Sequence, residues 1–207
     1  MCRLFETIRI EDGRPMNLVW HEERMLRSGL MRDAGCGMED AGYVSRNWLK
    51  ELISVPENMN EGIVKCNIIY DKEIIEIKFG QYVRRPVRSL KLIHARGLDY
   101  HLKYFDRSVL DTLFAERGDC DDVIIVNDGL ITDTSFSNLI FFNGESWYTP
   151  ARPLLEGTCR ARLLSEKRII AVDIRPSDLT RYQGCKLINA MRMPEEEEII
   201  RNEGMKD

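Results

Sequence analysis

The chain has no apolar run long enough to cross a bilayer, and no apolar signal region follows Met1. We therefore expect no membrane partner and no export, which predicts a cytoplasmic protein. An excess of positive charge is also lacking. The net charge of −4 gives no electrostatic footprint for nucleic acid. The local basic stretch that begins at Arg84 and Arg85 is interpreted as a solvated linker.

Metal-binding and redox motifs are missing as well. The six cysteines form no C-x-x-C pair and no tight cluster with any of the three histidines, which argues against a structural zinc site. Scattered single cysteines in a cytosolic chain are most often small core residues, so we expect most of these thiols to be buried. No metal site is predicted.

What remains is the composition of a folded protein. Of the 207 residues, 43% are hydrophobic and 31% are charged, which is typical of a soluble enzyme or binding domain. The chain is long enough to form one large domain or two small ones. The residue pattern breaks around Arg84-Arg85-Pro86, where a new strand begins. We therefore expect a smaller domain over residues 1–85 and a larger one over residues 89–207.

Both halves mix strand and helix patterns, which predicts an α/β (α+β) class. In the first half we expect strands at 3–10, 15–19, 62–71 and 73–83, and helices at 21–35 and 42–54. In the second half we expect helices at 106–118 and 157–167, and strands within 88–93, 121–133, 137–150, 169–176 and 185–191. The last residues either end in solvent or form a final strand.

One strand-like segment has a polar centre. Apolar residues stand at 130–131 and 139–142, but between them residues 132–138 are polar except for Phe136. A buried hydroxyl, amide or carboxylate costs free energy unless it is hydrogen-bonded. This segment therefore needs partners, which are its own side chains, the backbone or a ligand.

Three residues of the second half stand in a suggestive order. Lys103 precedes a helix, Asp133 lies in the polar centre of the strand, and Gly157 stands at a predicted helix start. Each residue alone has an ordinary explanation: a surface charge, a carboxylate at a strand edge and a helix cap.

Together with the first half, these residues resemble the fold-type IV pyridoxal-phosphate (PLP) enzymes, which include the class IV aminotransferases and aminodeoxychorismate lyase. Seven stretches carry the resemblance in the family's order: LFETIRIEDG, HEER, LKYFDRSVL, ITDTSFSNLIFF, WYTP, LLEGTCRARLL and KLINAM. The resemblance implies a two-domain fold like that of D-amino acid aminotransferase, with PLP in the cleft between the domains. It also implies a homodimer. The alternative is a cofactor-free α+β domain that carries these stretches by chance.

The resemblance gives Lys103 and Asp133 specific roles. Lys103 is expected to bond covalently to the cofactor and to transfer protons, which requires a primary amine that can lose its charge. Asp133 is expected to face the pyridine nitrogen, where a carboxylate keeps that nitrogen protonated. Residues 134–138 would then hold a turn under the ring, so that the polar centre of the strand forms the floor of the cofactor site.

By the same resemblance, a cation and backbone N–H groups are expected to bind the phosphate group of PLP. Arg24 matches the family's phosphate arginine, and a guanidinium suits a bidentate contact. A close backbone approach and a helix N-terminus are expected at Gly157, Thr158 and Cys159. A second phosphate loop is matched by Asn189 and Ala190, for which a simple strand end is an equal alternative.

The chain departs from the family pattern at several positions. Asp133 stands where the family usually has Glu, Asp106 stands where Asn is usual, and Ala190 lacks a common hydroxyl. None of these changes removes the lysine, so cofactor binding is still expected. They leave open a PLP-binding protein with little or no turnover.

The choice of reaction depends on the LFETIR stretch. Thr7 matches the lyase branch, whereas branched-chain aminotransferases have glycine after the Glu, and a hydroxyl there can assist proton transfer. The simple alternative is that Thr7 is a good strand residue. We favour an amino-acid-like substrate and an aminodeoxychorismate lyase-like reaction that releases pyruvate and 4-aminobenzoate, a step of folate biosynthesis. The alternative enzyme is a class IV aminotransferase of the branched-chain or D-amino acid type.

Overall fold

The computed structural model describes residues 3–29 and 48–206. By their contacts the residues form two compact units, Met1–Val83 with Leu102–Asp106 and Arg84–His101 with Arg107–Asp207. Strands and helices are mixed in both units, which confirms the predicted α/β (α+β) class. Among the described residues, no helix is long and apolar enough to cross a membrane.

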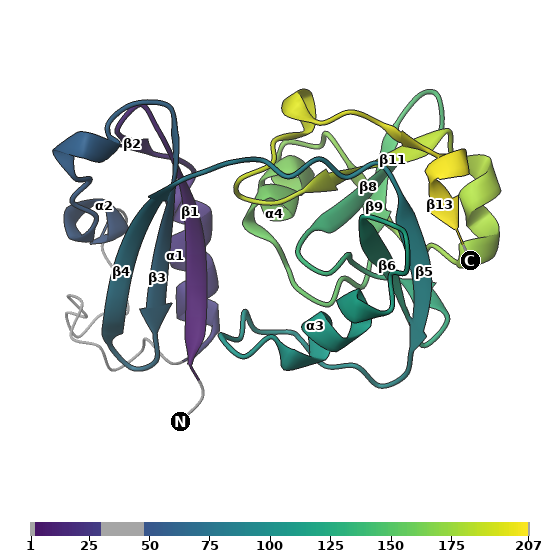
Figure 1. Cartoon of the computed structure of the whole chain (residues 1–207), viewed down its shortest axis with the longest axis horizontal. Helices are drawn as coiled ribbons and strands as arrows, with labels where there is room; N and C mark the ends of the chain where they lie inside the picture. Colours follow the sequence, from purple (N-terminus) through teal and green to yellow (C-terminus); the bar gives the residue numbers. More distant parts are fainter. Residues whose placement is uncertain (1–2, 30–47, 207) are drawn as a thin grey trace. The chain divides into compact units, whose positions relative to one another are not determined.

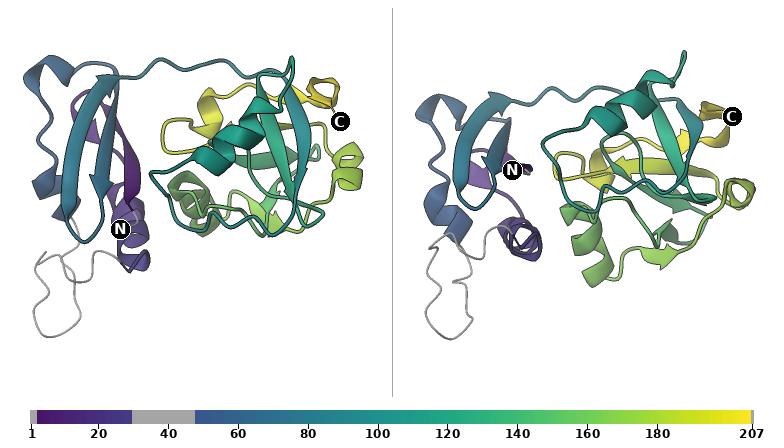
Figure 2. Two further views of the ribbon diagram at one scale, coloured as in Figure 1. Left: turned by 60° about the horizontal axis from the view of Figure 1, so that its bottom comes forward. Right: turned by 90° about the horizontal axis from the view of Figure 1, so that it is seen from below.

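The first unit is built on a four-stranded sheet with the strand order β2-β1-β3-β4 (Figure 1). Its strands are β1 (Leu4–Glu11), β2 (Arg14–Pro15), β3 (Ile63–Tyr70) and β4 (Ile74–Gln81), and its helices are α1 (Leu18–Arg27), α2 (Trp48–Leu52) and the short 3-10 helix η2 (Glu57–Met59). The period of two sends Leu4, Ile8 and Ile10 of β1 to one face, where they are buried. Met25 of α1 and Leu49 of α2 belong to the same apolar core. Figure 2 shows both helices beside this sheet.

The predicted strand over residues 15–19 is wrong. Strand β2 ends at Pro15, and α1 begins at Leu18. Asn17 between them has a left-handed backbone with φ of 56°, which breaks the extended chain and turns it into the helix. Of the predicted helices at 21–35 and 42–54, residues 30–35 and 42–47 lie outside the described residues.

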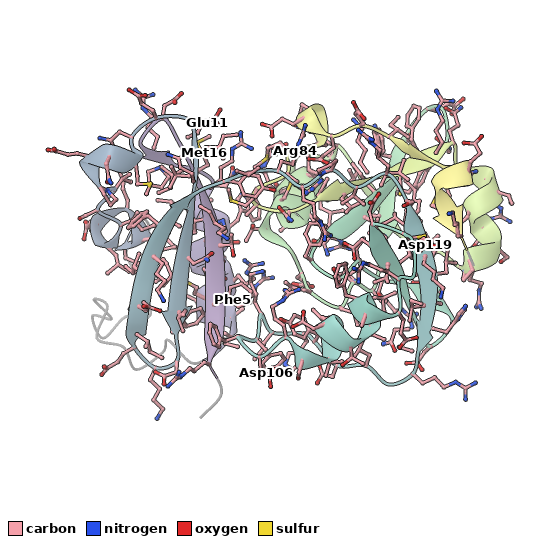
Figure 3. The ribbon with its side chains drawn as sticks, viewed as in Figure 1. Phe5, Glu11, Met16, Arg84, Asp106 and Asp119 are labelled. Atoms are coloured by element: carbon pink, nitrogen blue, oxygen red, sulfur yellow. The ribbon has the colours of Figure 1, made fainter. Side chains whose placement is uncertain are left out.

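The segment Leu102–Asp106 packs within the first unit because it pairs with the open edge of β1. The N–H of Phe5 donates to the carbonyl of Lys103 at 3.0 Å, and the N–H of Phe105 donates to the carbonyl of Arg3 at 2.9 Å. Figure 3 labels Phe5 on β1 and Asp106 at the end of this segment. Lys103, which the predicted boundaries assigned to the second domain, therefore belongs by its contacts to the first unit.

The second unit contains two sheets, with the strand orders β13-β5-β6-β7 and β10-β9-β8-β11-β12. Its strands are β5 (Leu90–Ala95), β6 (Asp122–Asn127), β7 (Leu130–Ile131), β8 (Asn138–Phe142), β9 (Trp147–Pro150), β10 (Ile170–Val172), β11 (Gly184–Ile188), β12 (Ile200–Arg201) and β13 (Met205–Lys206). Its helices are α3 (Ser108–Ala115) and α4 (Thr158–Ser165), with 3-10 turns η3 (Pro176–Arg181), η4 (Pro194–Glu196) and η5 (Asn202–Gly204). The last residues thus form strands, one of the two predicted outcomes.

The core of the second unit explains where its polar segment lies. Ile124 and Val126 of one sheet share a core cluster with Leu139 and Phe141 of the other. The chain passes from β7 in the first of these sheets to β8 in the second through residues 132–137. The polar centre of the predicted strand is therefore a crossing between two sheets.

The cysteines behave as the sequence predicts wherever they are described. Cys66, Cys120, Cys159 and Cys185 are free and buried. Burial raises the pKa of Cys66 to about 12 and that of Cys159 to about 11, so these side chains are neutral thiols at neutral pH. Cys2 and Cys36 lie outside the described residues.

Candidate active site

Arg24, the predicted phosphate ligand of the first unit, forms a buried ion pair with Glu6. Arg24 of α1 donates to Glu6 of β1 through two nitrogens, Nε to Oε1 at 2.8 Å and Nη2 to Oε2 at 2.5 Å. His21, one helical turn earlier, places Nδ1 2.7 Å from the same Oε2 atom. Glu6 is fully buried, and the Arg24 side chain is 11% exposed.

The electrostatics of this cluster define its proton positions. Burial alone would raise the pKa of Glu6, but the charge of Arg24 and the hydrogen bond of His21 outweigh burial and lower that pKa to about 2. Burial also lowers the pKa of His21, so the imidazole is neutral at neutral pH. Because Glu6 is ionised and can only accept, the His21 proton resides on Nδ1 and is donated to Glu6.

Lys103 and Thr7 lie on the other side of the same strand. The Lys103 ammonium is 4.4 Å from the centre of the Phe5 ring, a cation–π distance. Phe5 and Thr7 are two positions apart on β1 and therefore point to the same face, opposite to Glu6. The first unit thus carries three of the predicted residues, Lys103, Thr7 and Arg24, around one strand.

In the second unit, residues 132–138 form a hydrogen-bonded turn. The Thr132 hydroxyl donates to the carbonyl of Ile125 at 3.0 Å. The Thr134 hydroxyl accepts the N–H of Ser137 at 3.0 Å, and the N–H of Thr134 donates to the carbonyl of Ser137 at 2.8 Å. Much of the polar segment is therefore satisfied by its own side chains and by the backbone.

Asp133 is the charged residue of this turn and is 5% exposed. Its Oδ1 accepts from the Asn138 amide at 2.6 Å, and its Oδ2 accepts the N–H of Leu155 at 2.9 Å. Burial raises the pKa of Asp133 from 3.8 to about 6, against these two donors and the positive charge of Arg160. The backbone N–H of Leu154 also contributes to Asp133, and these donors together still do not fill the four acceptor positions of a carboxylate. Asp133 therefore keeps capacity for a further donor.

Gly157 is shaped by the same amide of Asn138. A Cβ atom at Gly157 would lie 2.0 Å from Asn138 Oδ1, although the backbone there (φ −69°, ψ 144°) suits any residue. Glycine is therefore needed for close packing against Asn138. As the N-cap of α4, Gly157 supplies no side-chain cap, so the amides of Thr158 and Cys159 begin the helix without one.

The predicted second phosphate loop is a tight turn fastened to the polar turn. The Asn189 amide donates to the Ser137 hydroxyl at 2.8 Å, and its oxygen accepts the N–H of Met191 at 2.8 Å. Asn189 and Arg192 exchange both backbone hydrogen bonds, at 3.2 Å each. Asn189 is thus largely occupied within the protein, and Ala190 lies inside the turn that these bonds close.

Several residues of these clusters have no role in the sequence-based prediction. Glu6 could have been found, because it is a charged residue at a core-facing position between Leu4 and Ile8. His21 stands in the HEER stretch, but nothing in that stretch shows its contact with Glu6. Arg160, which is 6% exposed and donates to the carbonyl of Pro150 at 2.8 Å, gave no signal at all.

These groups fit the chemistry of PLP. Its phosphate needs cations and N–H donors. The first unit offers a cation of this kind in Arg24, and the second unit offers N–H donors at the uncapped start of α4. Its aldehyde needs a primary amine, as in Lys103. Its pyridine nitrogen needs an acidic partner, and a buried carboxylate with spare acceptor capacity at Asp133 meets that need.

Comparison with known proteins agrees with this chemistry. Residues 76–194 match the amino-transferase class IV family. The chain belongs to this family. Class IV aminotransferases depend on PLP, so the protein is a PLP-dependent enzyme of fold type IV.

Individual relatives and solved structures are similar to most of this chain. An uncharacterized protein of Haemophilus influenzae is 37% identical over 196 residues, which cover 92% of this chain and 98% of the relative. A crystal structure from Haemophilus somnus 129PT, provisionally named 4-amino-4-deoxychorismate lyase, has 34% identity and a TM-score of 0.80 over 93% of this chain and 98% of that chain. A hypothetical aminotransferase of Mycobacterium tuberculosis in a PLP-bound form has a TM-score of 0.73 over 99% and 81% of the two chains. At 19% identity, that last structure shows the fold alone.

The raised pKa of Asp133 predicts a specific pH dependence for the cofactor-free protein. The folded protein holds this proton up to about pH 6, whereas the unfolded chain releases it near pH 3.8. Asp133 therefore lowers the free energy of unfolding as pH rises through this window, by ~2–3 kcal/mol. Asp133→Asn should remove this contribution to the decrease in the free energy of unfolding with rising pH. Urea unfolding of the wild type and of Asp133→Asn at pH 4, 5, 6 and 7 checks the prediction. The same dependence of the free energy of unfolding on pH in both proteins would contradict it.

Gly157→Ala should destabilise the second unit, because its methyl group must displace the Asn138 amide that holds Asp133. Overpacking of this kind typically costs about 1–3 kcal/mol. Gly80→Ala is the matched control, because a Cβ at Gly80 meets no atom within 4 Å. The measurement is the urea midpoint of each variant, and an equal shift for both variants would argue against the close packing.

Proposed function

We propose that the protein is a lyase of the aminodeoxychorismate lyase type, which releases pyruvate and 4-aminobenzoate from an amino-acid-like substrate. The observation that carries this proposal is the position of Thr7, whose hydroxyl group stands on the same face of β1 as the ring that the Lys103 ammonium contacts. The name of the Haemophilus somnus structure, at 34% identity, supports the same reaction.

Each unit would offer its own groups to the cofactor. In the first unit, Lys103 would provide the covalent link and Arg24 would bind the phosphate. In the second unit, Asp133 would bind the pyridine nitrogen. The phosphate would also receive N–H groups at Gly157, Thr158, Cys159, Asn189 and Ala190; since Asn189 already has several partners, Ala190 would act through its backbone.

When bound, PLP supplies an electron sink for the charge left after removal of a substrate proton. Lys103 would remove that proton as a base and return it later. Thr7 would hold a proton near the part of the substrate that leaves as pyruvate. The substrate splits into its two products without an added oxidant or a second substrate, so atoms and electrons balance within one molecule.

Class IV aminotransferase activity is the second candidate, favoured by the family to which the chain belongs. The two reactions share the removal of a proton by Lys103 and then diverge. A transaminase must pass the amino group to a 2-oxo acid, whereas the lyase needs no acceptor. Pyruvate release in the absence of any 2-oxo acid therefore distinguishes them. By the same resemblance we propose a homodimer, and the cytoplasmic location stays a prediction from the sequence.

Lys103 should carry the cofactor. Borohydride reduction of the purified holoenzyme, followed by peptide mapping, should find the pyridoxyl label on the peptide that contains Lys103. Lys103→Ala should remain unlabelled, while Lys78→Ala, at a side chain 67% exposed and paired with Glu76, should be labelled as the wild type is. A label on a different lysine would refute this assignment.

Thr7→Val should lower kcat for pyruvate release by about 10²-fold, since positioned proton transfer typically contributes at least this much. Valine keeps the size and the strand preference of threonine, so PLP content should not change. Thr7→Ser retains the hydroxyl and should retain most of the activity. Full turnover in Thr7→Val would show that Thr7 is a strand residue only.

A further inference from the structure

We propose that Glu6 is a positioning residue that selects which edge of the Arg24 guanidinium is presented to an anion, and that His21 fixes Glu6 in this task. The anion is the phosphate ester of the cofactor. This inference rests on the proposed role of Arg24 as a phosphate ligand and extends it to two residues that would act through Arg24.

The geometry of the guanidinium group is the first step. Arginine has five N–H donors in one plane, which form a side edge at Nε and Nη2 and an end edge at Nη1 and Nη2. Glu6 takes the side edge with both of its oxygens. The end edge therefore remains for a second bidentate partner, which suits a phosphate group.

The orientation of Glu6 is the second step. Its Oε2 atom receives Nη2 of Arg24 and also the Nδ1 proton of His21. Because His21 and Arg24 lie three positions apart on α1, both donors come from one face of the helix. A carboxylate held by three donors in a fully buried position has little freedom to rotate, and the guanidinium bound to it is restricted in the same way.

The charges of the cluster are the third step. Glu6 is negative, Arg24 is positive and His21 is neutral, so the cluster has no net charge. If Glu6 were only a counter-charge, it would weaken phosphate binding, because it cancels the charge of Arg24. If Glu6 is a positioning residue, it strengthens phosphate binding, because it prepares the end edge before the phosphate arrives. The two explanations predict opposite signs.

The experiment measures phosphate recognition separately from the covalent link. Apoprotein is titrated with PLP and with pyridoxal, which has the same aldehyde and ring but no phosphate, and the ratio of the two dissociation constants is taken from absorbance spectra. In Glu6→Gln, this preference for PLP should fall by about tenfold, the loss expected for a charge-assisted contact. An unchanged or stronger preference for PLP would overturn the proposal.

Glu6→Gln should raise the preference for PLP, instead of lowering it, when residue 24 is lysine. A lysine has a single ammonium group, and in Arg24→Lys the buried Glu6 holds it, so the preference for PLP should fall about tenfold or more. In the double variant Glu6→Gln/Arg24→Lys the ammonium is released, and the preference should rise above that of Arg24→Lys. A counter-charge would instead give a rise in both backgrounds.

Glu6→Asp tests the proposal with the charge retained. Its carboxylate is withdrawn by one methylene group, so positioning predicts a weaker preference for PLP, whereas a counter-charge predicts no change. This variant also decides the question if Glu6→Gln fails to fold.

Glu22→Gln is the matched control. Glu22 lies on α1, is 4% exposed and accepts the N–H of Leu49 at 2.9 Å. Its substitution removes a buried carboxylate from the helix that carries Arg24, and it should lower stability without changing the preference for PLP. A fall equal to that of Glu6→Gln would mean that general destabilisation explains the effect.

The outcomes separate this inference from the proposed function. If wild-type apoprotein binds neither PLP nor pyridoxal, the proposed function fails. If the wild type prefers PLP and Arg24→Lys loses this preference while Glu6→Gln and Glu6→Asp keep it, only the positioning role fails.

Discussion

A carboxylate that is buried away from water must be met by donors or must give up its charge. Each unit contains a buried carboxylate that is subject to this constraint. Glu6 is met by a guanidinium and an imidazole N–H, and its pKa falls to about 2. Asp133 is met by an amide and by backbone N–H groups but by no cation, and its pKa rises to about 6. The partners of each carboxylate, in turn, fix the elements from which they come.

The two carboxylates are therefore suited to different tasks. Glu6 is already paired with a cation and remains ionised at any physiological pH, so it serves as a fixed part of the scaffold. Asp133 lacks a direct cationic partner among its hydrogen bonds and is costly to ionise. A cation placed beside Asp133 would offset that cost, which is the electrostatic condition for a group that holds a protonated pyridine nitrogen.

Membership in the class IV aminotransferase family defines the shared part of the chemistry, which is an amine, an acidic partner for the ring and a phosphate site. It does not by itself define the reaction, because one fold supports several outcomes after the common proton removal. Residues beside the amine have to decide between those outcomes. In this chain Thr7 stands on the β1 face that also carries Phe5, and the proposed lyase reaction depends on its hydroxyl group.

Local sequence was enough to predict most strands and helices, because periodicity and turn residues act over a few positions. It also predicted roles for Lys103 and Asp133, through motifs that resemble those of the family. It failed at residues 15–19, where the left-handed backbone of Asn17 overrides a strand-like pattern. The polar composition of residues 132–138 was visible as a need for partners, but the partners themselves were not.

The sequence by itself therefore determined the class of fold and the family, and it predicted the reactive groups. Only the tertiary structure decided how those groups are held. Contacts such as Glu6 with Arg24, Asp133 with Leu155 and Gly157 with Asn138 join residues 18 to 22 positions apart that no local pattern pairs. The physical reason is that hydrogen bonds and close packing depend on where distant segments meet, whereas periodicity records only which side of each segment is buried.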